Sequence, residues 1–540
     1  MIFLKKIKYL FLIVITITLF SCSPKKNYFT DKDVFRYNEH ANIATLDPAF
    51  ARKQAEIWPM NHLYNGLVQL DENLNVLPAI AKKWKFSDNG KTIDFILRKD
   101  VFFHKDKAFG KDSTRTVKAT DFTYSFKRLL DPKVASPGKW VLNNVKSFEA
   151  INDTVFRIKL KEAFPPFLGL LTMKYCSVVP KEAVEFYGNK FRSHPVGTGP
   201  FYLKLWVENT KLVLRKNKLY FEKENGKQLP YLEAISITFL PDKQSEFLQF
   251  IQGKLDLLSG IDASFKDEIL TETGNLQPKY RQKITLQKAP YLNTEYLGFF
   301  MEVNPNYPTA NLKIRKALNY GFDRVKMIKY LRNGIGTPAV NGFIPKGLPS
   351  FNNIKGYTYK PKKAKQLIQN YILETGDTHP KITITTDAQY LDLCEYIQQE
   401  MSNLGLEVKI DVLPPSMLRQ GKSKGELPVF RASWIADYPD AENYLSLYYS
   451  KFFTPNGSNY THFKNPDFDR LYEKAIATTD NKKRYKIYQK MDSIIIDKAP
   501  IVPLYYDEVT RFSQKNIQNL KINAINLLDL KKVRKKRSEL

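Results

Sequence analysis

Asp437 is the residue of this sequence best suited to binding chemistry. It lies in residues 434–438, Trp-Ile-Ala-Asp-Tyr, where apolar and aromatic neighbours flank the carboxylate, and Pro439 follows directly. These surroundings predict a buried acid, and a desolvated carboxylate without a partner is costly. Asp437 therefore either binds a group from outside the chain or, as the alternative, caps a turn as a structural carboxylate.

The histidines form no recognisable catalytic or metal-binding motif. No two of them stand four residues apart, and the sequence has no H-E-x-x-H, G-x-S-x-G or Walker pattern. We therefore expect no enzymatic activity, no catalytic residue, no bound metal and no cofactor. A secreted hydrolase built from carboxylates that are distant in sequence stays open. The six histidines are His40, His62, His104, His194, His379 and His462.

Residues 197–200, Gly-Thr-Gly-Pro, stand between apolar stretches and predict a tight turn. Glycine there would permit a positive φ and a close approach of the backbone. The glycines are not followed by the lysine and the Ser or Thr that complete a phosphate-binding loop. We expect a turn of the scaffold, with contact to a ligand as the alternative.

The elements that must position such residues are a mixture of strands and helices. Residues 92–97 alternate polar and apolar side chains as a strand does, and residues 314–330 carry apolar side chains at helical spacing. Residues 469–497 also predict helix.

The chain after residue 22 is too long for one core, because single cores stop growing near roughly 250 to 300 residues. We expect two or three domains. No Gly/Ser-rich or Pro-rich linker separates them, which indicates closely packed lobes joined by several short crossings. Hinge closure around a ligand suits that arrangement.

Residues 1–22 predict a signal peptide. Lysines precede an apolar run over residues 9–20, which is shorter than the roughly 20 residues of a membrane-spanning helix. The run ends in Leu-Phe-Ser-Cys, which resembles a bacterial lipobox and implies cleavage before Cys22 and lipid on its thiol. Residues 23–33 would be a tether at the cell envelope, on the periplasmic or extracytoplasmic face of the membrane. An uncleaved anchor is the alternative.

The formal net charge is +29, which would suit a nucleic-acid partner if the cations were clustered. They are spread along the chain, with one dense run at 531–537 and no nucleic-acid-binding signature. We expect no nucleic-acid partner and a solvated basic surface instead.

Cys176 and Cys394 are more than two hundred residues apart and make no disulfide framework.

Motifs spread in order over most of the chain resemble the oligopeptide- and dipeptide-binding lipoproteins of bacterial ABC importers, the extracellular solute-binding proteins of family 5. Each motif is short, and the joint signal comes from their number and order. They are residues 43–48 (IATLDP), 63–67 (LYNGL), 77–84 (LPAIAKKW), 87–92 (SDNGKT), 95–99 (FILRK), 118–122 (KATDF), 194–201 (HPVGTGPF), 229–232 (LPYL), 314–318 (IRKAL), 323–324 (DR) and 431–440 (RASWIADYPD).

The resemblance implies an α/β fold of the class II periplasmic-binding-protein type, with two lobes, an extra inserted N-terminal domain and a ligand cleft between the lobes. Lobe I would be discontinuous and comprise residues 34–66, 190–288 and 499–540. Domain II would be inserted at 67–189, and lobe III would comprise 289–498. The protein would act as a monomer and deliver its ligand to importer permease subunits.

The resemblance also implies a site. In peptide-binding members the aspartate of the 431–440 motif pairs with the free α-amino group of the ligand, and it maps onto Asp437; a desolvated ammonium needs such a charged partner. Arg431 would meet the ligand carboxylate, with pairing to a nearby acid as the alternative. Trp434 and Tyr438 would line side-chain pockets or else lie in the core.

The resemblance further implies that the ligand is held as an added strand, which gives affinity through main-chain hydrogen bonds. The edges would be the backbones of residues 42–45 and 433–437, so Asn42 and Ala44 complete the set of candidate contacts. We expect short peptides as ligands. The alternative is a non-peptide solute on the same fold, such as a metal chelate, a sugar or a cell-wall fragment.

Overall fold

Three larger β-sheets organise residues 33–261 and 265–536, the parts of the chain that the computed structural model describes. The first sheet has the order β1 (Val34–Asn38), β12 (Ala234–Thr238), β9 (Lys211–Lys216), β8 (Phe201–Val207). The second has the order β4 (Ala81–Ser87), β5 (Thr92–Leu97), β7 (Val155–Leu160), β6 (Val145–Asn152). The large sheet has the order β13 (Leu257–Ser259), β19 (Ile501–Gln514), β14 (Ile284–Phe299), β18 (Val429–Ile435), β16 (Lys381–Thr386), β17 (Glu407–Val412), and β15 (Thr337–Pro338) pairs with β19.

Short two-stranded ladders complete the strands: β2 (Val68–Leu70) with β3 (Val76–Pro78), β10 (Lys223–Glu224) with β11 (Lys227–Gln228), and β20 (Ile517–Gln518) with β21 (Arg534–Lys535). The α-helices are α2 (Gln54–Leu63), α3 (Ala119–Leu130), α4 (Phe167–Leu170), α5 (Lys181–Tyr187), α6 (Lys243–Ile251), α7 (Lys266–Ile269), α8 (Leu312–Tyr320), α9 (Arg324–Arg332), α10 (Pro361–Thr375), α11 (Leu391–Ser402), α12 (Pro415–Lys424), α13 (Glu442–Leu445), α14 (Pro466–Ile476) and α15 (Asn481–Lys498).

β5 confirms the predicted strand at residues 92–97. Ile93, Phe95 and Leu97 are buried, and the strand lies between β4 and β7. α3 packs on this sheet, where Phe126 meets the ring of Phe156 edge-on at a centroid distance of 5.5 Å. Alternating burial along a strand thus gives the second sheet one face for a helix.

The segments predicted as helical at 314–330 and 469–497 are confirmed as helical, and each comprises two helices, α8 with α9 and α14 with α15. Asp323 lies between α8 and α9, and its carboxylate accepts hydrogen bonds from the backbone N–H groups of Val325 and Lys326. Asp480 caps α15 in the same way, through the N–H of Lys483. Side-chain caps satisfy N–H groups that have no partner within a helix, and they favour a new helix start at these points.

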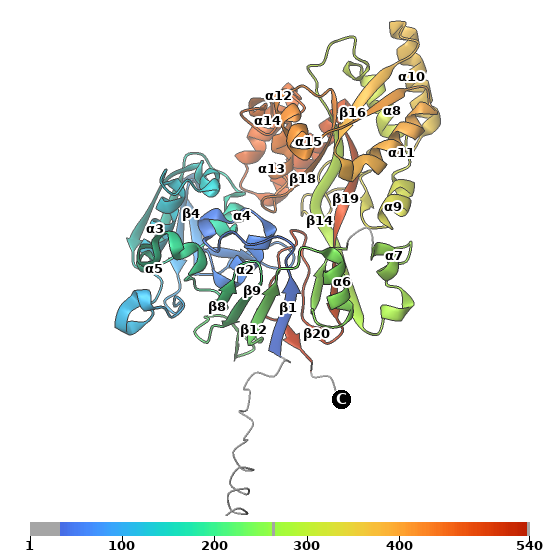
Figure 1. Cartoon of the computed structure of the whole chain (residues 1–540). Coiled ribbons are helices and arrows are strands. Elements are labelled where there is room, and N and C mark those ends of the chain that lie inside the picture. The colour runs from blue at the N-terminus through green and yellow to red at the C-terminus, as the bar shows by residue number, and fades with distance from the viewer. Residues whose placement is uncertain (1–32, 262–264, 537–540) are drawn as a thin grey trace, which may run out of the picture.

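β14 and β19 join the two lobes. They are antiparallel partners over most of their length, with an irregularity between Pro290 and Thr294. Figure 1 shows them running from the body that contains β1 and α6 to the body that contains β16 and α11. The two halves of this ribbon therefore lie in different lobes, and the register of the pairing shifts between them.

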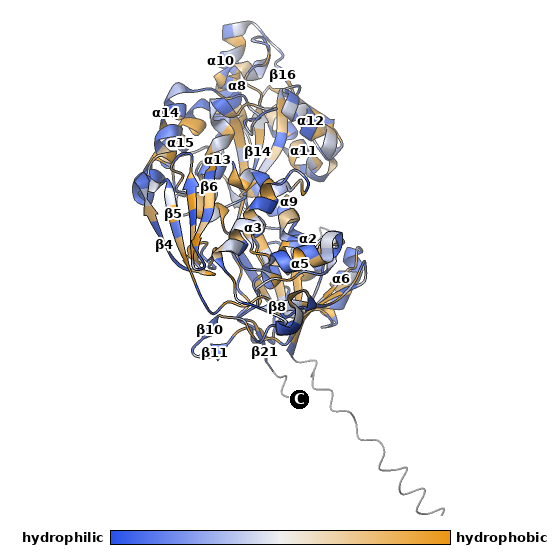
Figure 2. Cartoon of the chain, turned by 90° about the vertical axis from the view of Figure 1, so that its left-hand side faces the viewer, coloured by the Kyte–Doolittle hydropathy of each residue, from blue (hydrophilic) through white to orange (hydrophobic). Residues whose placement is uncertain are grey.

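The hydrophobic cores follow this division. One buried cluster joins the first and second sheets and contains Phe35 of β1 and Phe95 of β5. The large sheet has separate clusters on its two faces, one with Phe430 and the other with Val429, which are neighbours on β18. In Figure 2 hydrophobic residues follow the strands, whereas outer helices such as α10 and α14 alternate hydrophilic and hydrophobic segments.

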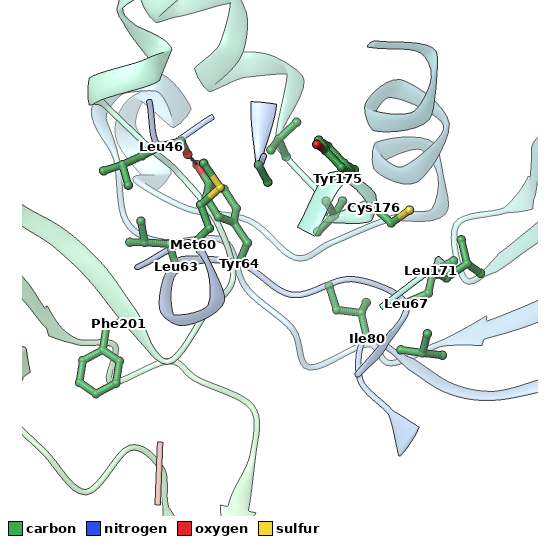
Figure 3. Packing of buried hydrophobic residues seen from close by; sticks show 14 of the residues in the cluster. Leu46, Met60, Leu63, Tyr64, Leu67, Ile80, Leu171, Tyr175, Cys176 and Phe201 are labelled. Atoms are coloured by element: carbon green, nitrogen blue, oxygen red, sulfur yellow. Dashed lines mark hydrogen bonds between the residues drawn. The ribbon is translucent and has the colours of Figure 1, made fainter. Parts of the chain in front are cut away.

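The end of α2 packs tightly in the core of the first two sheets. Tyr64, directly after α2, donates its hydroxyl hydrogen to the carbonyl of Leu46 over 2.9 Å (Figure 3). A Cβ on Gly197 would lie 2.1 Å from the carbonyl oxygen of Leu63, and one on Gly199 would lie 2.3 Å from that of His62. The 197–200 segment is therefore a close backbone approach, as expected, although neither glycine is among those with positive φ.

His104 holds the same segment. The N–H of Gly197 donates to Nδ1 over 3.2 Å, and Nε2 lies 3.0 Å from the carbonyl oxygen of Gly199, so the ring is neutral with its proton on Nε2. Burial lowers the pKa of His104 to about 4. This histidine is a structural residue of the scaffold.

Residues 1–32, which include the predicted signal peptide, Cys22 and nearly all of the predicted tether, lie outside the described residues. Within the described ranges no helix is long and apolar enough to cross a membrane. Cys176 and Cys394 are both buried as free thiols.

Candidate ligand-binding site

A cavity of about 1280 Å³ opens between the lobes. Ordinary small-molecule pockets measure roughly 300 to 1,000 Å³, so the cleft has room for a ligand of several residues. Its lining includes side chains from α2, from the β2–β3 hairpin, from the segments around residues 140 and 174, from the loop after β18, and from the C-terminal residues 519–532.

Asp437 lines this cleft from the loop that follows β18. The loop is held by Asn443 of α13, whose side-chain oxygen accepts from the indole N–H of Trp434 over 2.8 Å and from the backbone N–H of Asp437 over 3.1 Å. The Asn443 amide also donates to Oδ2 of Asp437 over 3.4 Å. One buried amide therefore fixes both the loop and the carboxylate.

Asp437 has no cation within ion-pair distance among the side chains that the structure describes. Its side chain is exposed to the cleft, yet the surrounding walls exclude enough solvent to raise its pKa above the ordinary value, an effect that the Asn443 amide opposes. The site thus presents a partly desolvated carboxylate to the cavity without a protein partner. Such a group can bind an ammonium.

Arg431 pairs with nearby acids, which is the alternative that the sequence analysis left open. It is buried on β18, its guanidinium pairs with Glu295 of β14 and lies 3.8 Å from the carboxylate of Asp387, and it stacks 3.1 Å from the ring centroid of Tyr390. It is not among the residues that line the cleft. Its contact with a ligand carboxylate stays a prediction.

Neither Trp434 nor Tyr438 is among the residues that line the cleft. Trp434 packs against the core cluster that contains Phe430. Tyr438 is buried, donates to Glu442, and its Cβ lies 3.7 Å from the place a Cβ on Gly169 would occupy. Tyr438 therefore packs the Asp437 loop against Gly169 of α4.

Asn42 and Ala44 are exposed and do not line the cleft. The carbonyl of Ala44 accepts a hydrogen bond from Arg192 over 3.3 Å. The structure therefore brings neither residue to Asp437, and the added-strand contact at residues 42–45 stays a prediction.

The sequence reasoning missed most of the cleft residues, and Arg52, Lys174 and Tyr175 are among those it missed. Burial raises the pKa of the Tyr175 hydroxyl, Arg52 lowers it and Asp437 raises it further, so this ring lies within the electrostatic reach of both charges. No sequence signal marks these residues, because they come from segments hundreds of positions from Asp437 and meet it only in the fold.

A two-lobed α/β molecule with a large cleft between its lobes and an unpaired charged group on the wall has the architecture of a solute-binding protein. The family model described as bacterial extracellular solute-binding proteins, family 5, middle region, matches residues 75–456. The chain belongs to this family, and both the resemblance and the fold class expected from the sequence are confirmed.

Named relatives span nearly the same length. The chain is 28% identical to heme-binding protein A of Haemophilus influenzae, over 82% of this chain and 81% of that protein. It is 25% identical to the dipeptide-binding protein of Escherichia coli, over 86% and 87%. Among solved structures, the periplasmic binding protein DppA from Helicobacter pylori in complex with the peptide STSA matches with a TM-score of 0.73 at 26% identity, over 93% and 98%.

Proposed function

We propose that this protein captures short peptides outside the cytoplasmic membrane and delivers them to an ABC-type importer. The observation that carries the proposal is Asp437, a carboxylate on the wall of a cleft of about 1280 Å³ that has no cationic partner within residues 33–261 and 265–536. A dipeptide-binding relative and a peptide-bound relative support the same ligand class. The ligand's free ammonium would supply the missing cation.

In this proposal lobe III, residues 289–498, carries Asp437 and closes on lobe I and on domain II, residues 67–189. The β14–β19 ribbon is the hinge, because its register is interrupted between Pro290 and Thr294 and loop or strand-end residues take up the dihedral change in hinge motions. Closure removes water from the ammonium and the carboxylate together, which strengthens their attraction.

The ammonium pairing is tested with Asp437→Asn, which keeps the size of the side chain and removes its charge. Truncating one member of a desolvated charge pair costs on the order of 2 to 5 kcal/mol, so affinity for a free-amine peptide should fall by roughly tenfold to several thousandfold. Isothermal titration with trialanine and N-acetyl-trialanine measures it. Equal binding of the two peptides by the wild-type protein would contradict the role of Asp437.

Ligand class is tested by mass spectrometry of whatever co-purifies from the native cells. Peptides with free amino termini support the proposal, and cleavage of added peptides into products would replace it with a hydrolase.

A non-peptide ligand on the same fold is the second candidate, favoured by the relative named as a heme-binding protein. A Soret absorption band that follows addition of heme in a stoichiometric titration would support that candidate.

The anchor belongs to the same proposal. A diacylglyceryl group on Cys22, together with a further acyl chain, would hold the protein at the membrane surface, since one chain alone gives only marginal binding. Mass spectrometry of the N-terminal peptide from the membrane fraction should find the lipid. Release of a Cys22→Ser variant from that fraction supports it, and retention with an intact signal segment favours the uncleaved anchor.

A further inference from the structure

A second, smaller cavity lies in the body that contains β1 and α6. Its volume is about 110 Å³, several times the roughly 10 to 15 Å³ that one water molecule needs, so it has room for a small ligand. Its walls come from the end of β1, from α2, from α6 and from β13. The lining residues are Tyr37, Asn38, Glu39, His40, Gln54, Trp58, Glu246, Leu257 and Ser259.

Two carboxylates face this cavity, and only one of them has a cationic partner within the described ranges. Oε2 of Glu246, on α6, lies 2.8 Å from Nε2 of His40. Glu39 has no ion pair among the described residues, and its Oε1 is buried there without a hydrogen-bond partner. Burial, and then the charge of Glu246, raises the pKa of Glu39 to about 8. Burial also raises the pKa of Glu246, whereas His40 and Lys243 lower it.

The hydroxyl of Tyr37 is an independent sign of a ligand. Tyr37 is 1% exposed and lines the cavity, and its hydroxyl has no hydrogen-bond partner in the part of the chain that the structure describes. Burial and the charge of Glu39 raise the pKa of this hydroxyl, so the two groups lie within electrostatic reach of each other. Because buried polar groups are nearly always hydrogen-bonded, the hydroxyl and the carboxylate together indicate a binding site.

The walls favour an ammonium over a metal ion. The described residues contain no group of three or more His, Cys, Asp or Glu side chains that could hold a metal ion. The rings of Tyr37 and Trp58 form part of the wall, with their centroids 5.8 Å apart, and aromatic rings attract ammonium ions. A primary ammonium has three N–H donors, which matches two carboxylates and one hydroxyl.

We propose that this cavity binds a primary ammonium, which donates hydrogen bonds to Glu39, Glu246 and the hydroxyl of Tyr37. Gln54 and Trp58 line both this cavity and the large cleft, so the two spaces adjoin at α2. The ammonium therefore belongs either to a free small amine or to a side chain of the ligand in the cleft. The site itself does not depend on the function proposed for the cleft.

The experiment is an isothermal titration with methylammonium chloride. Tetramethylammonium chloride, which has the same charge and no N–H group, is the control cation and should not bind. Glu39→Gln should lower the affinity for methylammonium at least about tenfold, the effect of removing one member of a buried charge pair. Glu149→Gln is the matched control variant, because Glu149 is an exposed carboxylate on β6, and it should bind as the wild type does.

Tyr37→Phe separates binding from folding. It removes only the hydroxyl that has no partner within the described residues, so the variant should unfold at a temperature no lower than that of the wild type. Its affinity for methylammonium should nevertheless fall severalfold. A lower unfolding temperature with unchanged affinity would assign the hydroxyl to the fold and contradict the proposal.

Binding should also release a proton at pH 7, because the pKa of Glu39 is about 8 and only the ionised carboxylate attracts a cation. Affinity should rise from pH 6 to pH 9, since an alkylammonium of the lysine type keeps its proton up to about pH 10.4. Glu39→Gln should remove this rise, although Tyr37, His40 and Glu246 still face the cavity. Titrations in two buffers of different ionisation enthalpy count the protons.

Two peptides identify the source of the ammonium. If Glu39→Gln weakens the binding of Ala-Lys-Ala and not that of trialanine, the ammonium is a side chain of the cleft ligand. If it weakens methylammonium alone, the ligand is a free amine. Either result supports the site.

The inference is wrong if methylammonium does not bind, if Glu39→Gln binds it as tightly as the wild type does, or if calcium chloride binds in its place. The function proposed for the cleft is untouched by those results. Failure of both peptides to bind, while methylammonium still binds, would refute the proposed function and leave this site in place.

Discussion

At the scale of single residues, the site depends on one amide. Asn443 is buried and bonds to Trp434, to the backbone of Asp437 and to its carboxylate. Asn443→Ala should leave the indole N–H and the loop without acceptors, which costs about 1 to 3 kcal/mol for each buried group left unpaired.

The expected result is a peptide affinity reduced by about tenfold or more, with a smaller loss in overall stability. Titration calorimetry and urea unfolding measure the two effects separately. Ser446→Ala, which removes a hydroxyl bonded to the carbonyl of Asn443 in the same turn, is the control and should bind normally. Unchanged affinity in Asn443→Ala would show that the loop is positioned by its backbone alone.

The same aspartate gives binding a pH dependence. Desolvation raises the pKa of Asp437 in the empty cleft, and only the ionised form attracts an ammonium. Affinity for trialanine amide should therefore fall as the pH is lowered through the raised pKa, with uptake of a proton by Asp437. The α-amino group of a peptide loses its proton near pH 8, so affinity should fall again above that value.

A titration series from pH 4 to pH 9 measures this profile. Using the amide removes the carboxylate of the ligand, so the alkaline limb reports the peptide's ammonium. Asp437→Asn should lose the acidic limb. A wild-type profile without an acidic limb would show that the carboxylate does not bind the ammonium.

At the scale of elements, β14 and β18 are joined by a buried ion pair. Glu295 lies opposite Ser433, two residues from Arg431, so the two charges are diagonal neighbours on one face. Burial raises the pKa of Glu295 and Arg431 lowers it. The arginine thus offsets part of the desolvation that burial imposes on the Glu295 carboxylate.

Arg431→Met should destabilise the protein by about 3 to 5 kcal/mol, because it leaves Glu295 buried without its partner. Adding Glu295→Leu should restore most of the loss, since two apolar side chains of similar size replace a buried pair at little cost. Denaturant unfolding of the single and double variants measures both values. A double variant as unstable as the single one would assign Arg431 a role beyond this pair.

The secondary structure of single segments could be predicted from the sequence, but which segments come together in the cleft could not. The alternation in residues 92–97 gave the bounds of β5 correctly. The apolar periodicity of 314–330 continues through Asp323, so it gave no sign that the Asp323 side chain ends one helix and caps the next. Asp437 stood out through its neighbours, whereas Lys174 and Tyr175, which line the same cleft, stand in a segment without a recognisable pattern.

At the scale of the whole molecule, the proposal requires motion. The lobes are joined through β14 and β19, and Tyr438 also packs against Gly169 of α4. Small-angle scattering should show a smaller radius of gyration when trialanine is added. Asp437→Asn at the same peptide concentration should stay at the unliganded value, and an unchanged radius in the wild type at saturation would mean that the cleft binds without closing.

The first strand has a mechanical consequence. β1 pairs with β12 in parallel through five residues in register, from Val34 with Ala234 to Asn38 with Thr238. Lys535 donates to the carbonyl of Val34 and pairs with Asp256, which also accepts from the backbone N–H of Arg36. A pulling force applied at residue 33 acts along the strand, so it loads these bonds together in shear and does not peel them one at a time. The fold is thereby reinforced at the point where a tether would transmit tension.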